Sequence, residues 1–309
     1  MMGGSFDIVG LGLAAVDDLV SVERYPPPDS KVPILRRVRR CGGLNATALV
    51  AAARLGSRVA YAGIVGNDED SRFVLDALRD KGVDTDHVYV YPGARPVLST
   101  VVIDEAERTR TIFMDTSGLV GPDEDWLPRE LLATCRVLLV DNFRIGLQIR
   151  AARFARESGA AVVADLDGAL SPRLGELIGL ADHLIVSSSY ATLLTGEHDP
   201  RAAALALRAP GRAVVITRGA EGSWYLHDVS SEPAHQEAFP VDAVDTNGCG
   251  DVFHGAYAVA LADRLPLPLR VRSASATAAL SATTPGGQEG IPDADAVTHF
   301  LAGHDGPPR

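Results

Sequence analysis

Short runs of β-branched and other apolar residues alternate with longer stretches rich in alanine and leucine along most of this chain. The strand-like run FDIVGLGL is followed by NATALVAAARLG, whose apolar spacing predicts a helix that Gly56 closes. RVAYAGIVG predicts the next strand, and DSRFVLDALRDKG predicts a helix that ends at Gly82. The same alternation returns in the second half, from RVLLVD onward. Apolar strands joined by helices predict an α/β fold with three layers, α/β/α, around a mostly parallel sheet.

Two segments interrupt this rhythm, approximately residues 13–41 and 91–118. The first has three consecutive prolines between strand-like stretches. The second contains PVLSTVVIDEAERTRTIFMD, which alternates like a hairpin with DEAERTR as its turn region. Because both lie between parallel βα units, we expect them to form a small separate sheet that projects from one domain of residues 1–309.

Composition restricts the partners more than it changes the fold. The chain is 46% hydrophobic and carries a formal net charge of −11, which disfavours nucleic acid and anionic membranes as partners. The cysteines, Cys41, Cys135 and Cys249, are scattered and odd in number. The N-terminus lacks the basic start of a signal peptide, and no apolar run reaches the length of a membrane span. We therefore expect a cytoplasmic protein with free thiols.

The stretch VDTNGCGDVFHGA places a glycine-rich loop directly before an apolar helix. A helix start presents unpaired N–H groups and a partial positive charge, and Gly248 and Gly250 would let an anion approach them. Asp251 stands where the helix should begin, so its carboxylate could accept a proton from a hydroxyl that attacks a phosphate. The alternative is an ordinary glycine turn in which Asp251 only caps the helix.

The wider string DTNGCGD, followed by VFHGA, resembles the D-T-x-G-A-G-D signature of the PfkB, or ribokinase-like, carbohydrate kinases. Cys249 replaces the usual alanine, and Asn247 replaces a common threonine. CGGLNATALVAAARLG and AYAGIVGNDEDSRFVLDALRDKGVD resemble the family's companion signature, so the resemblance runs from about Phe6 to Leu301. It implies the ribokinase-like fold, with the inserted sheet as a lid over the sugar and a homodimer formed through the lid.

The resemblance implies a catalytic role for the residues of this loop. Asp251 would be the base that deprotonates the sugar hydroxyl, and the amides of Gly248, Cys249 and Gly250 would form the anion hole. Cys249 could alternatively be a reactive thiol, because a helix start lowers a thiol pKa, or simply fill the place of the alanine.

On the nucleotide side, VVITRGAEGSWYL resembles the family's strand–turn–strand beside ATP, with Thr217, Gly219 and Gly222 at matching positions. An ordinary hairpin is the alternative. Asp245 would organise the loop and the water shell of Mg²⁺. TTPGGQEGIP, which contains Gly287, resembles the loop under the nucleotide where a monovalent cation such as K⁺ sits.

The family's Asn-x-x-Glu motif, which is linked to Mg²⁺, is not intact. Ser187 and Tyr190 stand at its positions. Mg²⁺ is still expected as the partner of ATP, because the phosphoryl charge must be neutralised, but no residue is assigned as its ligand.

On the sugar side, Asp17 matches the aspartate that hydrogen-bonds sugar hydroxyls, although by itself it could be a solvated strand end. Gly42 and Gly43 match the close-approach glycines under the sugar. Thr47 replaces an asparagine of ribokinases and ketohexokinases, and the neighbouring Asn45 is a candidate to compensate for it.

Within the family, several strings resemble sulfofructose kinases most closely, which implies a cation for an anionic ketose. Lys31 stands at the matching lysine, and Arg144 is a second candidate, one residue out of step with that group. Arg144 could equally be a solvated loop arginine. Met114 stands where that group has a polar residue on its lid hairpin.

The sequence therefore predicts an ATP-dependent carbohydrate kinase that phosphorylates a hydroxyl of a small sugar, a ketose or an anionic, sulfofructose-like derivative. A nucleoside kinase of the same fold is one alternative, with Tyr25, Tyr91 and Phe113 as the aromatic candidates on the lid. The other is a sugar-binding sensor without turnover, which the missing Asn-x-x-Glu suggests and the intact Asp251 opposes.

Overall fold

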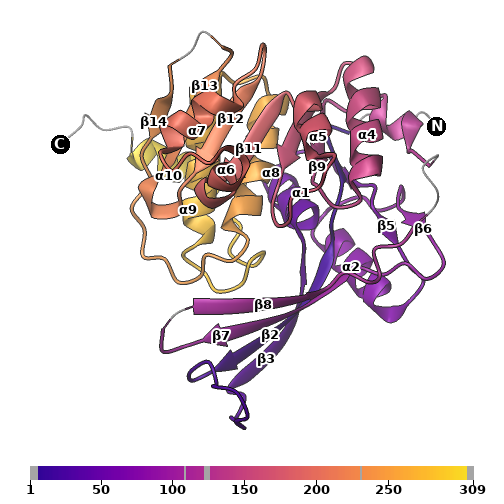
Figure 1. Cartoon of the computed structure of the whole chain (residues 1–309), viewed down its shortest axis with the longest axis vertical. Helices are drawn as coiled ribbons and strands as arrows, with labels where there is room; N and C mark the ends of the chain where they lie inside the picture. The colour runs from indigo at the N-terminus through magenta and orange to yellow at the C-terminus, as the bar shows by residue number, and fades with distance from the viewer. Residues whose placement is uncertain (1–5, 108, 122–125, 230–231, 305–309) are drawn as a thin grey trace.

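A computed structural model describes residues 6–107, 109–121, 126–229 and 232–304 of the chain. The ends of the predicted domain and Arg108 of the predicted hairpin turn lie outside the described residues. The centre of the molecule is an eight-stranded sheet that is parallel from β4 to β12 and antiparallel at β13 and β14 (Figure 1). Across the sheet the strands are β14 (Ala234–Gln236), β13 (Ser223–His227), β12 (Ala213–Thr217), β11 (His183–Ser187), β10 (Ala161–Asp165), β9 (Val137–Val140), β1 (Ile8–Leu11) and β4 (Val59–Tyr61).

Helices cover both faces of this sheet. Val137 and Leu139 of β9 enter one core cluster, whereas Leu138 and Val140 enter the other, because successive side chains of a strand point to opposite faces. Burial on both faces explains why these strands are apolar throughout. The first face is covered by α1 (Leu44–Arg54), α2 (Glu69–Asp80), α8 (Cys249–Ala262) and α9 (Leu267–Ser281), and α10 (Ala294–Gly303) packs on α9. The second face is covered by α3 (Arg129–Leu132), α4 (Ile145–Glu157), α5 (Leu174–Leu180), α6 (Ser188–Thr195) and α7 (Pro200–Leu207).

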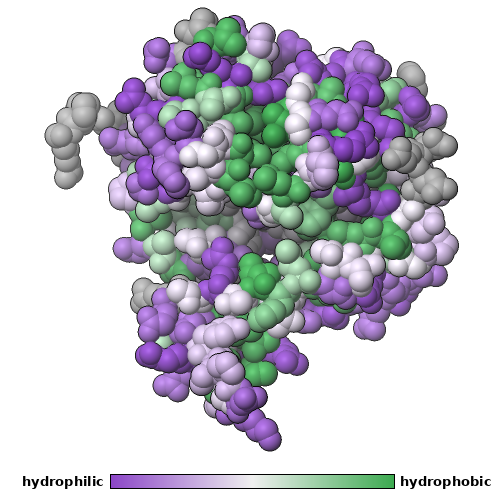
Figure 2. Space-filling model, viewed as in Figure 1, coloured by the Kyte–Doolittle hydropathy of each residue, from purple (hydrophilic) through white to green (hydrophobic). Residues whose placement is uncertain are grey.

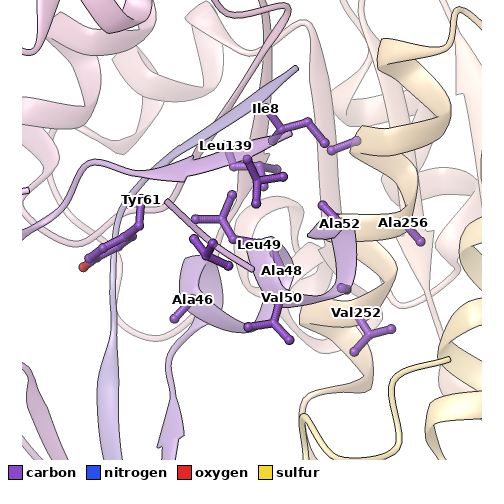
Figure 3. Close-up of a cluster of buried hydrophobic side chains, with 14 of the residues drawn as sticks. Ile8, Ala46, Ala48, Leu49, Val50, Ala52, Tyr61, Leu139, Val252 and Ala256 are labelled. Atoms are coloured by element: carbon purple, nitrogen blue, oxygen red, sulfur yellow. The ribbon is translucent and has the colours of Figure 1, made fainter. Parts of the chain in front are cut away.

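The packing of α1 against α8 forms the middle of the first core. Figure 3 shows side chains of α1, including Leu49, between the strand residue Leu139 and helix α8, which carries Val252. The two helices approach closely because Gly255 has no side chain: a Cβ at this position would lie 2.1 Å from the carbonyl oxygen of Ala48. The starts of α1 and α8 are therefore held side by side.

A second, four-stranded sheet projects from the body, in the order β3 (Arg36–Gly42), β2 (Ala15–Val22), β7 (Val97–Asp104) and β8 (Thr109–Asp115) (Figure 1). β2 pairs with β7 in parallel, and the two outer pairs are antiparallel. A short pair, β5 (Ile64–Val65) and β6 (Tyr89–Val90), lies beside the body. Figure 2 shows that the molecular surface is concave where the body meets this projecting sheet.

The predicted fold class, a three-layer α/β/α fold with a small second sheet, is confirmed. Since the chain enters the projecting sheet directly after β1, the polar residues of β2 lie near the carboxyl ends of the parallel strands, where ligands of open α/β sheets bind. Within the described part of the chain, no helix has the length and apolar character that crossing a membrane requires.

Candidate active site

The first turn of α8 holds the residues to which the sequence assigns phosphate transfer. Gly248 precedes the helix with φ 73°, a left-handed conformation that glycine adopts without a Cβ clash. The helix begins at Cys249 without a side-chain cap, and Gly250 is exposed. The N–H groups of this turn are therefore available, together with the positive end of the helix dipole, to an anion in front of the helix.

Asp245 fixes the loop that leads into α8. One of its carboxylate oxygens accepts a hydrogen bond from the backbone N–H of Asn247 at 2.9 Å, and the other accepts one from the N–H of Gly286, also at 2.9 Å. Bonds of this kind to a charged acceptor are stronger than those between neutral groups. Asp245 thus ties the loop before α8 to loop 283–290, which follows α9.

A pocket of about 400 Å³ lies between the projecting sheet and the start of α8. It brings together residues that the sequence assigned to the sugar site with the assigned base, Asp251. Its full lining is Asp17, Leu19, Arg40, Cys41, Gly42, Gly43, Thr47, Asn247, Gly248, Asp251, Gly287, Gln288 and Glu289.

The two glycines at the start of α1 are required by close contacts. A Cβ on Gly42 would lie 1.9 Å from a carboxylate oxygen of Asp17, so any side chain there would displace that carboxylate. Gly43 has φ 99°, and a Cβ on it would lie 2.7 Å from the carbonyl oxygen of Leu13. These residues let the backbone pass directly beneath the pocket and leave Asp17 free to face into it.

Loop 283–290 supplies the wall that the sequence did not predict. Gln288 donates from Nε2 to the hydroxyl of Thr47 at 3.0 Å and accepts from Nζ of Lys81 at 2.7 Å. Arg40 of the projecting sheet pairs with Glu289 at 2.7 Å. The sequence assigned this loop, through Gly287, to the nucleotide, whereas Gly287 lines the pocket that contains Asp17. The signal in the sequence for this wall is the pair Gln288 and Glu289, two long polar side chains that directly follow two glycines.

Three residues assigned to the substrate do not line this pocket. Lys31 lies in the loop between β2 and β3, at the free end of the projecting sheet (Figure 1). Asp17 is five residues from the end of β2, where this loop begins. At about 3.3 Å per residue, the start of the loop lies roughly 16 Å from Asp17. Arg144 precedes α4 with φ 53° and donates to the carbonyl oxygen of Val120. It borders another hollow, formed in part by Phe143.

Asn45, the third, serves the scaffold. Its side chain is buried and donates from Nδ2 to a carboxylate oxygen of Asp141 at 3.2 Å. The same oxygen accepts the backbone N–H of Leu13 at 2.6 Å, and the other accepts that of Phe143 at 3.0 Å. Asn45 therefore holds the start of α1 to the end of β9 and cannot at the same time replace the sugar-binding asparagine.

A larger cavity of about 1270 Å³, open to solvent, lies on the other side of the start of α8. Thr217, at the end of β12, Gly219 and Gly222 border it, as the sequence predicted for the nucleotide side. Gly219 and Gly222 have φ values of 54° and 80°, so the turn between β12 and β13 depends on glycine. The rest of the wall is mostly apolar and includes Ala220, Ala238, Phe239, Pro240, Val241, Ala243, Phe253, Ala278, Ala279 and Ala282.

The first turn of α8 separates the two cavities. Gly248 and Asp251 line the smaller pocket, whereas Cys249 and Gly250 line the larger one. A group held by the N–H groups of this turn therefore lies between a polar pocket with two aspartates and an apolar cavity large enough for a nucleotide.

Burial controls the protonation of the carboxylates in the polar pocket. It raises the pKa of Asp251, and the negative charge of Asp165 raises it further. Burial also raises the pKa of Asp17, which a hydrogen bond with Ser99 partly offsets. A carboxylate whose pKa lies above its usual value is a better proton acceptor near neutral pH. The location of Asp251 and its raised pKa together suit a general base.

Cys249 is a thiol rather than a thiolate. Burial, followed by the charges of Asp245 and Asp251, raises its pKa to about 11. The helix start therefore does not activate this sulfur, and its structural interpretation, as a residue in the place of an alanine, is favoured over a reactive one.

The described residues contain no cluster of three or more His, Cys, Asp or Glu side chains that could hold a metal ion. Ser187 and Tyr190, at the positions of the family's Asn-x-x-Glu, serve α6 instead: the Ser187 hydroxyl accepts the backbone N–H of Tyr190 at 3.2 Å. Ser187 and Tyr190 offer no carboxylate oxygen to a metal ion. The site therefore fits a metal that is bound by the nucleotide phosphates better than one held by protein ligands.

The comparisons with known proteins agree with this geometry. The family model described as pfkB family carbohydrate kinase matches residues 7–294. The chain is 30% identical to the ribokinase of Bacillus subtilis over 96% of its length and 99% of that protein, and 28% identical to the ribokinase of Haemophilus influenzae over 94% and 97%. A putative ribokinase from Agrobacterium tumefaciens, 30% identical, superimposes with a TM-score of 0.89 over 98% of this chain and all of that one. This chain belongs to the pfkB family of carbohydrate kinases, enzymes that use ATP to phosphorylate an alcohol group of a sugar.

Proposed function

We propose that this enzyme transfers the γ-phosphate of ATP to a hydroxyl of a small neutral sugar, a pentose or a ketose, bound in the polar pocket. The observation that carries the proposal is the shared wall between the two cavities, the first turn of α8. Asp251 accepts the proton of the attacking hydroxyl, and the amides of Gly248, Cys249 and Gly250 stabilise the charge on the transferred phosphoryl group. Asp17 binds other hydroxyls of the sugar.

The charge of the pocket supports a neutral sugar over a sulfonated or phosphorylated one. Among the described residues that line it, Asp17, Asp251 and Glu289 carry carboxylates and Arg40 carries a positive charge. Glu289 already pairs with Arg40 at 2.7 Å, so an anionic substituent would have to displace a carboxylate. Relatives named ribokinase, deoxyribokinase and probable fructokinase match most of this chain, which supports the same class.

ATP is expected in the larger cavity, with its base against the apolar wall around Phe239 and its phosphates toward the start of α8. Mg²⁺ enters with the nucleotide and supplies neutralisation of phosphoryl charge. The K⁺ site that the resemblance implies at the loop of Gly287 is part of the proposal, and replacement of K⁺ by Na⁺ in the assay tests whether activity depends on it.

Phosphorylation of a sugar panel, measured as ADP formed, tests the substrate class. We expect turnover with a neutral pentose or ketose, and none with sulfonated or phosphorylated ketoses or with adenosine. Activity confined to an anionic ketose would refute the neutral class, and preference for adenosine would support the nucleoside kinase.

The role of Asp251 is tested by Asp251→Asn, which keeps the size of the side chain and removes the base. We expect turnover to fall about 10²–10⁴-fold while calorimetry still detects sugar binding. Near-normal turnover of this variant would contradict the assignment.

We further propose that the projecting sheet acts as a lid that excludes water from the polar pocket, and that two copies of the chain associate through it. Ile112, Phe113 and Met114 of β8 are about half exposed, which suits an apolar contact between copies. Light scattering at micromolar concentration should give the mass of a dimer, and a monomer would exclude this association.

A further inference from the structure

One buried histidine near the candidate base has an unusual set of neighbours. His254 is 5% exposed and Asp165, at the end of β10, is also 5% exposed. Nδ1 of His254 lies 2.8 Å from the carbonyl oxygen of Gly250 and 3.3 Å from a carboxylate oxygen of Asp165. Nε2 lies 3.1 Å from the carbonyl oxygen of Ile185. Both ring nitrogens thus face backbone carbonyl oxygens, which can only accept hydrogen bonds.

A neutral imidazole cannot satisfy these contacts, because it carries one N–H group. Its other nitrogen would then direct a lone pair at a carbonyl oxygen about 3 Å away. The doubly protonated ring donates to both carbonyls and places its positive charge 3.3 Å from a carboxylate oxygen of Asp165 that accepts no hydrogen bond from the described residues. Burial is the largest influence on the pKa of His254 and lowers it overall, while the two carbonyl acceptors and the charge of Asp251 oppose this effect. Because the cation can donate to both carbonyl oxygens and the neutral ring leaves one of these contacts repulsive, the hydrogen-bond geometry favours the charged form.

His254 and Asp165 both lie close enough to the candidate base, Asp251, to affect its pKa. His254 follows Asp251 by three residues, so both are on one side of α8. The other charged groups that act on Asp251 are Asp165, Asp167 and Asp17, and all of them are negative. His254 acts in the opposite direction, since its positive charge lowers the pKa of Asp251. Burial, followed by the negative charges of Asp141 and Asp167, raises the pKa of Asp165 well above its ordinary value, and a positive charge on His254 would oppose this shift.

We propose that His254 is a buried imidazolium, paired with Asp165, that keeps Asp251 ionised and therefore able to act as the base at neutral pH. It is a positioning residue that acts through Asp251 and the carbonyl of Gly250 and does not touch the substrates. The proposal rests on the proposed role of Asp251, but the charge of His254 can be measured separately.

The charge is measured by ¹⁵N NMR of the imidazole nitrogens in the intact enzyme, with His254→Asn used to assign the signals. We expect both nitrogens of His254 to be protonated at pH 7 and to remain so above the ordinary histidine pKa of about 6.5. One unprotonated nitrogen at pH 7 would overturn the proposal, whatever the enzyme phosphorylates.

The effect on the base is measured by the pH profile of kcat. In His254→Asn, which keeps one hydrogen-bond donor and loses the charge, the acid limb should move to higher pH. The rate at a pH on that limb should fall about tenfold relative to the alkaline plateau. His254→Asn combined with Asp165→Asn removes both charges and should return the limb toward its original position.

A purely structural role would lower the plateau without moving the limb, and an unmoved limb in a folded His254→Asn enzyme would overturn the proposal. If Asp251→Asn retained near-normal turnover, the proposed function itself would fail, and the NMR result would still report the charge of His254. The two failures are therefore distinguishable.

Discussion

Asp17 and the glycines beneath it show how single residues shape the polar pocket. Gly42 leaves the space that the carboxylate of Asp17 occupies, and Gly43 adopts a φ of 99° so that the chain can turn into α1. Ser99, on the neighbouring strand β7, hydrogen-bonds Asp17 and opposes the effect of burial on its pKa. The carboxylate is thus held in place and kept available as an acceptor.

Asp17→Asn should weaken sugar binding with little effect on the nucleotide. The amide keeps the size of the side chain, but it exchanges a charged acceptor for a neutral group, a loss of about 1.5–3 kcal/mol for hydrogen bonds to a charged group. We expect the KM for the sugar to rise roughly 10- to 100-fold while the KM for ATP stays within about twofold. Equal changes in both constants would contradict the separation of the two cavities.

Sequence and structure diverge most at individual side chains. The pattern around Asp251 predicted the helix start, because glycines and an aspartate before an apolar helix have few structural explanations. The assignment of Lys31 rests on its position in the motif PDSKVP. The structure places it in the loop between β2 and β3, at the end of the hairpin away from Asp17. Glu289 and Arg40 could not be predicted as partners, because 249 positions separate them and nothing local links them.

At the scale of elements, the contact between α1 and α8 aligns the two halves of the site. The start of α1 borders the polar pocket, and the start of α8 forms the wall between the polar pocket and the larger cavity. Gly255 allows the helices to approach so closely that a Cβ there would lie 2.1 Å from the backbone of Ala48. The alternation of apolar strands and helices predicted both helices, but the distance between them depends on this one glycine.

Gly255→Ala should destabilise the protein by about 1–3 kcal/mol, because the added methyl group meets backbone that cannot move out of its way. Gly179→Ala in α5 is a matched control: a Cβ there meets nothing within 4 Å. The control should leave the free energy of unfolding unchanged or raise it by up to about 1 kcal/mol. Urea denaturation of the two variants provides the comparison, and similar effects would show that the close contact is not responsible.

At the scale of the whole molecule, ion pairs connect the projecting sheet to the body. Arg39 pairs with Asp70 of α2 at 2.8 Å, and Arg40 pairs with Glu289 at 2.7 Å. These side chains are partly exposed, so each pair contributes about 0.2–1 kcal/mol and less at high salt. Contacts of this strength can hold the projecting sheet near the body and still allow it to open.

Glu289→Gln and Arg40→Gln should each raise the KM for the sugar about two- to fivefold at low salt, with a smaller difference at high salt. The double variant should be no worse than the more affected single variant, because either change breaks the same pair. Arg173→Gln, which breaks an exposed pair with Glu176 on α5, should leave the KM unchanged. Additive effects of the first two substitutions would argue that each side chain acts on the sugar independently.

The short loop 283–290 has a consequence that extends beyond its own contacts. Asp245 connects it to the loop before α8, while Gln288 and Glu289 connect it to Thr47 and to Arg40. If nucleotide binding at one end of this loop changes the affinity for the sugar at the other, thermodynamic reciprocity requires the sugar to change the affinity for the nucleotide by the same factor. Coupling between the two cavities would then pass through the eight residues of loop 283–290, in addition to the direct contact of the substrates at the first turn of α8.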